Sequence, residues 1–172
     1  KALPPSMTLS IKPVRLIELI NIRHPNCQQY LGFSMTDDRQ RIHIICDCLS
    51  LTNLKEFLHV STGKLSVYVR LRIALEIARG IAYLHSRQPS IVHGNLGAES
   101  IYLNQSVSTV KIGDYKLVLD ESTDSLANDV YQFGIILQEI WFWNIEEINE
   151  HRNSLQGPIL TLIHSCKFDV EH

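Results

Sequence analysis

The chain has 172 residues, of which 45% are hydrophobic and 20% are charged, and its formal net charge is -2. This composition is typical of one globular domain with its own core, and it excludes an intrinsically disordered chain. The near-neutral charge provides no large electropositive surface, which argues against a nucleic-acid-binding protein. We therefore expect a single domain that covers residues 1–172.

The apolar runs are shorter than the roughly 20 residues that cross a bilayer, and the N-terminal residues lack a signal-peptide core. The cysteines lie inside apolar runs instead of at the spacings of a disulfide framework. They are Cys27, Cys46, Cys48 and Cys166. We therefore expect a cytoplasmic protein, or the cytoplasmic part of a larger receptor. Cys46 and Cys48 could form half of a metal site, but no second pair has suitable spacing, so a strand is the preferred interpretation.

The first third of the chain predicts a helix followed by a hairpin. A helix-like apolar pattern runs from Val14 to Ile22 and stops at His24-Pro25-Asn26. Two strand-like runs, Cys27–Ser34 and Arg41–Cys48, flank an Asp-Asp pair that favours a turn. The two runs are therefore predicted to pair as antiparallel strands.

Two helices are predicted in the middle of the chain. Asn53–Leu58 is a short helix that begins at Thr52 or Asn53, because both side chains can cap a helix. From Leu65 to Ser86, apolar residues recur at intervals of three and four and form one broad stripe, so this is predicted as a buried central helix. Gly80 lies within it. A glycine inside a helix costs about 1 kcal/mol relative to alanine, so we expect another element to approach closely there.

The last third contains two more predicted helices. The segment Asp129–Trp143 is apolar nearly all round, which predicts a helix buried on every side. Trp141 and Trp143 stand at its end, where core packing is preferred over a partner-docking surface. A further packed helix is predicted from Gly157 to Cys166.

The segment between the two long helices carries the most specific pattern. It reads Ile-Val-His-Gly-Asn-Leu-Gly-Ala-Glu-Ser-Ile-Tyr-Leu over residues 91–103, and a second strand follows, Val-Lys-Ile-Gly-Asp-Tyr-Lys over residues 110–116. This order of helix, tight loop, strand, turn and strand ending near Asp114 resembles the catalytic loop and magnesium loop of protein kinases. The flanking segments Arg79–His85 and Asp129–Gly134 are similar to kinase helices of tyrosine-kinase-like families.

The resemblance implies an α+β fold, namely a mainly helical kinase-like large lobe with the end of the small lobe, one helix and a β-hairpin. Residues 1–48 would be the partial small lobe and residues 49–172 a large lobe that is incomplete at its C-terminus. It also implies a structural spine of bulky side chains, with Asp129 holding the catalytic-loop backbone. The spine residues would be Leu19, Tyr30, His93 and Tyr115.

The resemblance further implies that the catalytic positions are degenerate. Asn95 stands where an active kinase has the Asp that accepts the substrate proton, and Gly97 where it has a cation. Ser100 replaces the Asn that binds a second magnesium, and Gly94 replaces the loop arginine beside His93. Asp114 alone keeps its identity, as a candidate magnesium ligand.

A nucleotide site is implied only in part. The candidate nucleotide-binding residues are Lys1, Cys46, Cys48, Tyr102 and Asp114, with Ile136 and Ile140 also under the adenine. The sequence contains no glycine-rich phosphate loop, and Tyr102 would crowd the adenine.

By spacing, the helix partner of Lys1 is Arg15 or, less well, Glu18, and Lys1 facing Arg15 would give repulsion instead of an ion pair. Only residues 117–128 separate Lys116 from Asp129, which is too short for the usual peptide-substrate platform.

These substitutions predict a pseudokinase that acts as a scaffold or allosteric regulator in signalling and requires no cofactor. Its partner would be a protein, such as an active kinase or another domain of the same protein. The alternative is a nucleotide-binding switch for ATP and magnesium, or a weakly active Ser/Thr or Tyr protein kinase. A third interpretation is an interaction module that docks a partner through Trp141 and Trp143.

Overall fold

The computed structural model describes residues 13–36, 42–47, 52–61, 65–119 and 123–142. Its first elements are α2 (Pro13–Ile20), β1 (Tyr30–Met35), β2 (Ile42–Cys46), β3 (Thr52–Asn53) and α3 (Leu54–Val60). They are followed by α4 (Val67–His85), the 3-10 turn η1 (Ala98–Ser100), β4 (Ile101–Leu103), β5 (Val110–Ile112) and α5 (Leu126–Trp141). The helices and two small sheets confirm the predicted α+β fold. Several predictions lie outside the described residues, namely those for Lys1, Cys48, Trp143, Cys166 and the helix from Gly157.

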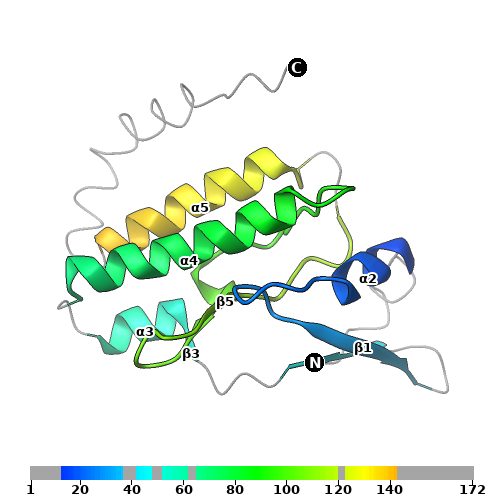
Figure 1. Ribbon diagram of the computed structural model, residues 1–172, viewed down its shortest axis with the longest axis horizontal. Helices are drawn as coiled ribbons and strands as arrows, with labels where there is room; N and C mark the ends of the chain where they lie inside the picture. The colour runs from blue at the N-terminus through cyan, green and yellow to red at the C-terminus, as the bar shows by residue number, and fades with distance from the viewer. Residues whose placement is uncertain (1–12, 37–41, 48–51, 62–64, 120–122, 143–172) are drawn as a thin grey trace.

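The predicted hairpin is confirmed. β1 and β2 pair as antiparallel strands, with Phe33 opposite Ile44 and Met35 opposite Ile42, and the register shifts between Tyr30 and Gly32. Helix α2 precedes the hairpin and lies beside it at one end of the molecule (Figure 1). The partial small lobe is therefore one helix and two strands.

Both predicted helices of the middle segment form, and each begins at a side-chain cap. Asn53 accepts a hydrogen bond from the Glu56 amide at 2.8 Å at the start of α3, and Ser66 accepts one from the Val69 amide at 3.3 Å at the start of α4. Such caps satisfy amides that the first helical turn leaves without a partner. Helix α4 then runs through the centre of the molecule, between α5 and the sheet of β3, β4 and β5 (Figure 1).

At Gly80, helix α4 is approached closely by the segment before β1 and by β5. A β-carbon added there would lie 2.9 Å from the carbonyl oxygen of Asn26 and 3.0 Å from the Cδ1 atom of Ile112. Asn26 also donates from Nδ2 to Glu76 on α4 at 2.7 Å and to the Val110 carbonyl at 2.9 Å. The segment before β1 therefore lies directly against α4 and β5, as the glycine predicted.

Helix α5 forms as expected, but the prediction that it is buried on every side is wrong. Asp129, Ile136 and Ile140 are buried, whereas 53% of Val130 and 38% of Trp141 is exposed. The reason is that α4 packs along one side of α5, and among the described elements it is the one with an extensive contact to that helix (Figure 1). An apolar sequence does not reveal how many neighbours a helix has.

Two expectations from composition concern membranes and metals. None of the helices in the described ranges combines the length and the apolar character that crossing a bilayer requires. Within those same ranges, the His, Cys, Asp and Glu side chains form no cluster suited to a metal ion. Burial raises the pKa of the Cys27 thiol to about 12, so that thiol stays protonated and is a poor metal ligand.

Candidate functional site

The catalytic-like loop after α4 is anchored by the buried carboxylate of Asp129. Its Oδ2 atom accepts a hydrogen bond from the His93 amide at 2.7 Å and lies 3.0 Å from Nε2 of His85. Its Oδ1 atom accepts from the Gly94 amide at 3.0 Å. Burial alone would raise the pKa of Asp129, but these hydrogen bonds lower it. The sequence singled out Asp129 for this position and missed His85, whose only signal was its place at the end of the long helix.

The four predicted spine residues lie in one buried core. The ring of Tyr115 lies 5.4 Å from that of Tyr30 and 5.0 Å from that of His93, centroid to centroid. Leu19 on α2 is fully buried in the same core. Burial lowers the pKa of His93 to about 4, so its ring is neutral, and its Nε2 atom lies 2.9 Å from the Gly113 carbonyl oxygen. The rings thus connect the small-lobe hairpin to the loop.

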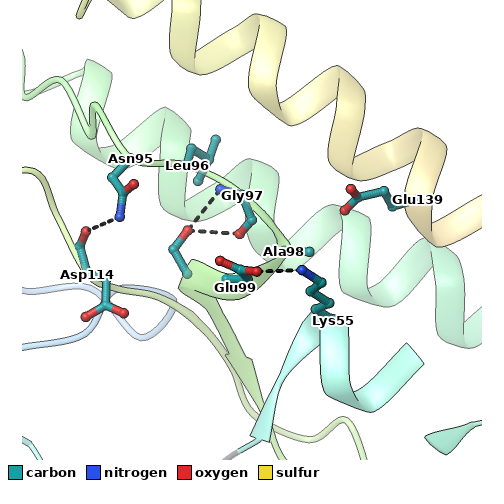
Figure 2. A pocket seen from close by; sticks show the side chains of 9 residues that line it. Lys55, Asn95, Leu96, Gly97, Ala98, Glu99, Asp114 and Glu139 are labelled. Atoms are coloured by element: carbon teal, nitrogen blue, oxygen red, sulfur yellow. Dashed lines mark hydrogen bonds and ion pairs between the residues drawn. The ribbon is translucent and has the colours of Figure 1, made fainter. Parts of the chain in front are cut away.

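Two polar side chains of the altered catalytic loop, Asn95 and Ser100, bond to backbone groups (Figure 2). The Asn95 amide nitrogen donates to the carbonyl oxygen of Asp114 at 3.1 Å. The Ser100 hydroxyl donates to the Gly97 carbonyl at 2.9 Å and accepts from the Gly97 amide at 3.0 Å. A carboxamide and a hydroxyl therefore act here as backbone braces, and Gly97 contributes no side chain.

Asp114, the candidate metal ligand, is contacted by a side chain of the cleft floor. The Tyr102 hydroxyl on β4 donates to Oδ2 of Asp114 at 2.6 Å. Burial first, and then the Asp114 carboxylate, raise the pKa of Tyr102, so the phenol keeps its proton. Asp114 has a φ of 54°, in the left-handed region that Asp tolerates better than most residues. These residues fit a magnesium–nucleotide poorly, because the phenol lies on the carboxylate that would bind the metal.

A cavity of about 340 Å³ opens beside this loop. It is lined by Asn95, Gly97, Ser100 and Asp114 from the loops, by Lys55 from α3 and by Glu139 from α5. The Lys55 ammonium lies 2.6 Å from Glu99, and both side chains are largely exposed. The sequence motif indicates the loop residues but not Lys55 and Glu139, because these two come from helices that meet the loop only in three dimensions.

The buried Arg15 side chain of α2 reaches the same loops. Its Nη2 atom donates to the Val92 carbonyl at 2.6 Å and to the Lys116 carbonyl at 3.0 Å, and its Nε atom donates to Lys116 at 3.1 Å. Glu18 lies 3.5 Å from the guanidinium. The expected repulsion concerned Lys1, which lies outside the described residues. The partners that Arg15 has are carbonyl oxygens and a carboxylate, which a cation favours.

Asp47, which follows β2, joins the hairpin to β5. Backbone hydrogen bonding joins the Asp47 amide to the Gln29 carbonyl at 3.0 Å, and the Gln29 amide donates to Oδ1 of Asp47 at 3.0 Å. The ammonium of Lys111 on β5 lies 2.5 Å from Oδ2 of Asp47. Cys46, one of the predicted nucleotide-binding residues, ends β2 just before this contact and is partly buried.

Together, the anchored loop, the ring contacts and the cleft define a protein-kinase-like domain. The family described as protein tyrosine and serine/threonine kinase matches residues 14–127 of the chain. The chain therefore belongs to the protein tyrosine and serine/threonine kinase family, and the resemblance drawn from the sequence is confirmed.

Individual relatives agree with this family. The "LRR receptor-like serine/threonine-protein kinase GHR1" of Arabidopsis thaliana is 31% identical over 70% of the chain, which spans 14% of that protein. From the same plant, the "Probably inactive leucine-rich repeat receptor-like protein kinase At5g58150" is 34% identical over 81% of the chain, which spans 21% of it. The structure of the maize sucrose-induced receptor kinase 1 kinase domain bound to AMP-PNP has a TM-score of 0.63 and 28% identity, and the match covers 76% of this chain and 57% of that one.

Proposed function

We propose that this domain is a pseudokinase, which binds a signalling partner as a scaffold or allosteric regulator instead of transferring phosphate. The observation that carries the proposal is the pair of contacts on Asp114. The Asn95 amide donates to its carbonyl and the Tyr102 phenol donates to its carboxylate. A neutral phenol thus lies on the carboxylate that would bind magnesium, and a neutral carboxamide that stands at the position of the base is bonded to backbone.

The size of the expected defect supports the same proposal. Removing one member of a catalytic constellation costs roughly 10³-fold to 10⁴-fold in rate, and such losses do not simply add. Here the base position is Asn95, the cation position is Gly97 and the second metal position is Ser100. A carboxamide cannot accept the substrate proton at neutral pH, and a glycine carries no charge for the transferring phosphoryl group.

The test is an assay for transfer of labelled phosphate from ATP, with magnesium and manganese and generic protein substrates. The parent and its Asp114→Asn variant should both show background incorporation only. Asn95→Asp is a matched control for the missing base. By itself it should restore no transfer, because Gly97 still provides no positive charge at the cation position. Robust turnover by the parent that Asp114→Asn abolishes would overturn the proposal.

A nucleotide-binding switch is the second candidate, and one observation favours it. The 28% identical maize kinase domain is described as bound to AMP-PNP, and Asp114 occupies the matching magnesium position of this chain. We propose that Tyr102 determines whether a magnesium–nucleotide binds, because its phenol contacts the Asp114 carboxylate that would hold the metal.

Thermal unfolding with ATP and magnesium separates these candidates. A ligand that binds the folded protein at 100 times its dissociation constant stabilises it by about 2.7 kcal/mol. The pseudokinase proposal expects no shift of the unfolding midpoint of the parent at millimolar ATP, with a shift emerging for Tyr102→Val, where a small aliphatic side chain replaces the phenol. A concentration-dependent shift in the parent would instead establish the switch.

The kind of partner is also a proposal. We propose a protein partner in a cytoplasmic signalling assembly, such as an active kinase or another domain of the same chain. Trp141, at the end of α5, is 38% exposed and belongs to the interaction-module alternative. Its replacement by alanine would reduce binding of an identified partner if that alternative holds, whereas a core role would lower stability instead.

A further inference from the structure

Helix α2 makes an unusual contact with the loops of the large lobe. Arg15 is 5% exposed and projects from the middle of the helix. Its guanidinium reaches the carbonyl oxygens of Val92 and Lys116, residues that lie before and after the cavity-lining loops in sequence. One side chain therefore joins the small-lobe helix to two separate segments of the large lobe.

The chemistry of these contacts favours a permanent link. A guanidinium is planar, keeps its charge and presents several donors in a fixed arrangement, so it bridges two carbonyl groups with less loss of side-chain freedom than an ammonium does. Burial lowers the pKa of Arg15, and Glu18 and Asp129 counter that effect by attraction. Because hydrogen bonds to charged groups are stronger than neutral ones, and buried ones exclude water, the link should resist opening.

The two segments that Arg15 bridges are themselves bonded to each other. The Lys116 amide donates to the His93 carbonyl at 3.0 Å, one residue beyond Val92. At a second point, Asp47 is joined to Lys111 on β5 and to Gln29. The partial small lobe is thus attached to the loops by Arg15 and to β5 by Asp47.

We propose that Arg15 is a nucleotide-independent tether that holds helix α2 against the loops around Val92 and Lys116, so that the position of α2 does not respond to ligand in the cleft. The Asp47–Lys111 pair is the second attachment point, between the end of β2 and β5. The proposal does not rest on the pseudokinase assignment, because the same tether could serve an active or an inactive site.

Hydrogen exchange followed by mass spectrometry tests the tether peptide by peptide. In Arg15→Met, which keeps the side-chain bulk but removes the donors, amides of α2 and of the segments around Val92 and Lys116 should exchange about tenfold faster or more, while those of α4 and α5 keep their rates. Arg23→Met is the matched control. Arg23 also donates to two carbonyls, at Ile20 and Ile22. Because Ile20 ends α2, the two variants are compared at the amides around Val92 and Lys116.

The outcomes are distinct. Equal exchange in the Arg15→Met and Arg23→Met proteins would overturn the tether, and so would a rise in α2 protection of the parent when ATP and magnesium are added. If Arg15→Met does not fold, Arg15→Lys replaces it. Lysine keeps the charge without the planar fork, so exchange in α2 should rise severalfold, and exchange at the parent's rate would refute the bridging role. Phosphate transfer by the parent would refute the pseudokinase proposal and leave this one intact.

Discussion

The buried framework around Asp129 and the altered catalytic loop of residues 91–103 both contain polar side chains that bond to backbone, but these side chains differ in charge. In the framework, Asp129 is a buried anion that accepts from two loop amides and from His85, as a structural anchor requires. In the loop, Asn95 and Ser100 bond to nearby backbone, and no anion stands at the position of the base. The comparison teaches that a kinase-like fold depends on the anchor and the core, whereas the reactive positions can change without loss of the fold.

Replacing Asp129 should have the largest effect on this comparison. Asp129→Ala leaves the amides of His93 and Gly94 and the ring of His85 without their buried acceptor, so we expect a loss of about 3 to 5 kcal/mol in the free energy of unfolding. Chemical denaturation measures it. Asp129→Asn keeps one acceptor oxygen and should lose less. A loop change, Glu99→Gln, should leave stability unchanged, and an Asp129→Ala protein as stable as the parent would break the distinction.

The buried His93 should make stability depend on pH. Burial lowers its folded pKa from 6.5 to about 4, so between these values the unfolded chain binds a proton that the folded chain does not. Stability is therefore complete above pH 6.5 and falls as the pH drops toward 4, by on the order of 2 kcal/mol. Denaturation of the parent and of His93→Phe, compared at pH 7 and 4.5, measures the contribution of His93 together with its effect on the neighbouring Asp129. Parallel pH profiles would contradict the assignment.

Two glycines sharpen the contrast between framework and loop. In Gly80→Ala the new methyl group would lie 2.9 Å from the Asn26 carbonyl oxygen, so the usual gain of alanine in a helix should turn into a loss of about 1 to 3 kcal/mol. In Gly97→Ala the new β-carbon meets nothing within 4 Å, and stability should change by less than about 0.5 kcal/mol. Thermal unfolding of the parent and of both variants measures these two changes in stability. Equal effects would mean that the loop is packed as tightly as the framework.

The Tyr102 contact should give the smallest effect. Tyr102→Phe removes the hydroxyl that donates to Asp114 and keeps the ring, so stability should fall by about 1 kcal/mol. The measurement is urea denaturation of the parent and of Tyr102→Phe. Tyr83→Phe is the control, because it makes the same substitution at a hydroxyl that accepts from the backbone amide of Arg23 instead of donating to a carboxylate. A Tyr102→Phe protein more stable than the parent would show that the hydrogen bond does not stabilise the folded cleft.

Local patterns in the sequence were sufficient for the helices, the hairpin and the capping residues. The 3.6-residue period of α4 and the Asn53 and Ser66 caps depend on neighbours a few positions away, so they are legible along the chain. The same holds for the substituted positions Asn95, Gly97 and Ser100, which follow from the order of the motif. The prediction for α5 failed because an apolar helix surface does not state which other elements cover it.

The sequence by itself determined the kinase family, the framework and the absence of the usual acid at position 95. Only the tertiary structure decided that Arg15 bonds to carbonyl groups 77 and 101 residues away and that the phenol of Tyr102 meets Asp114. The physical reason is that a local pattern fixes which backbone conformation forms, whereas the partner of a buried polar group depends on which distant segments the fold brings to it.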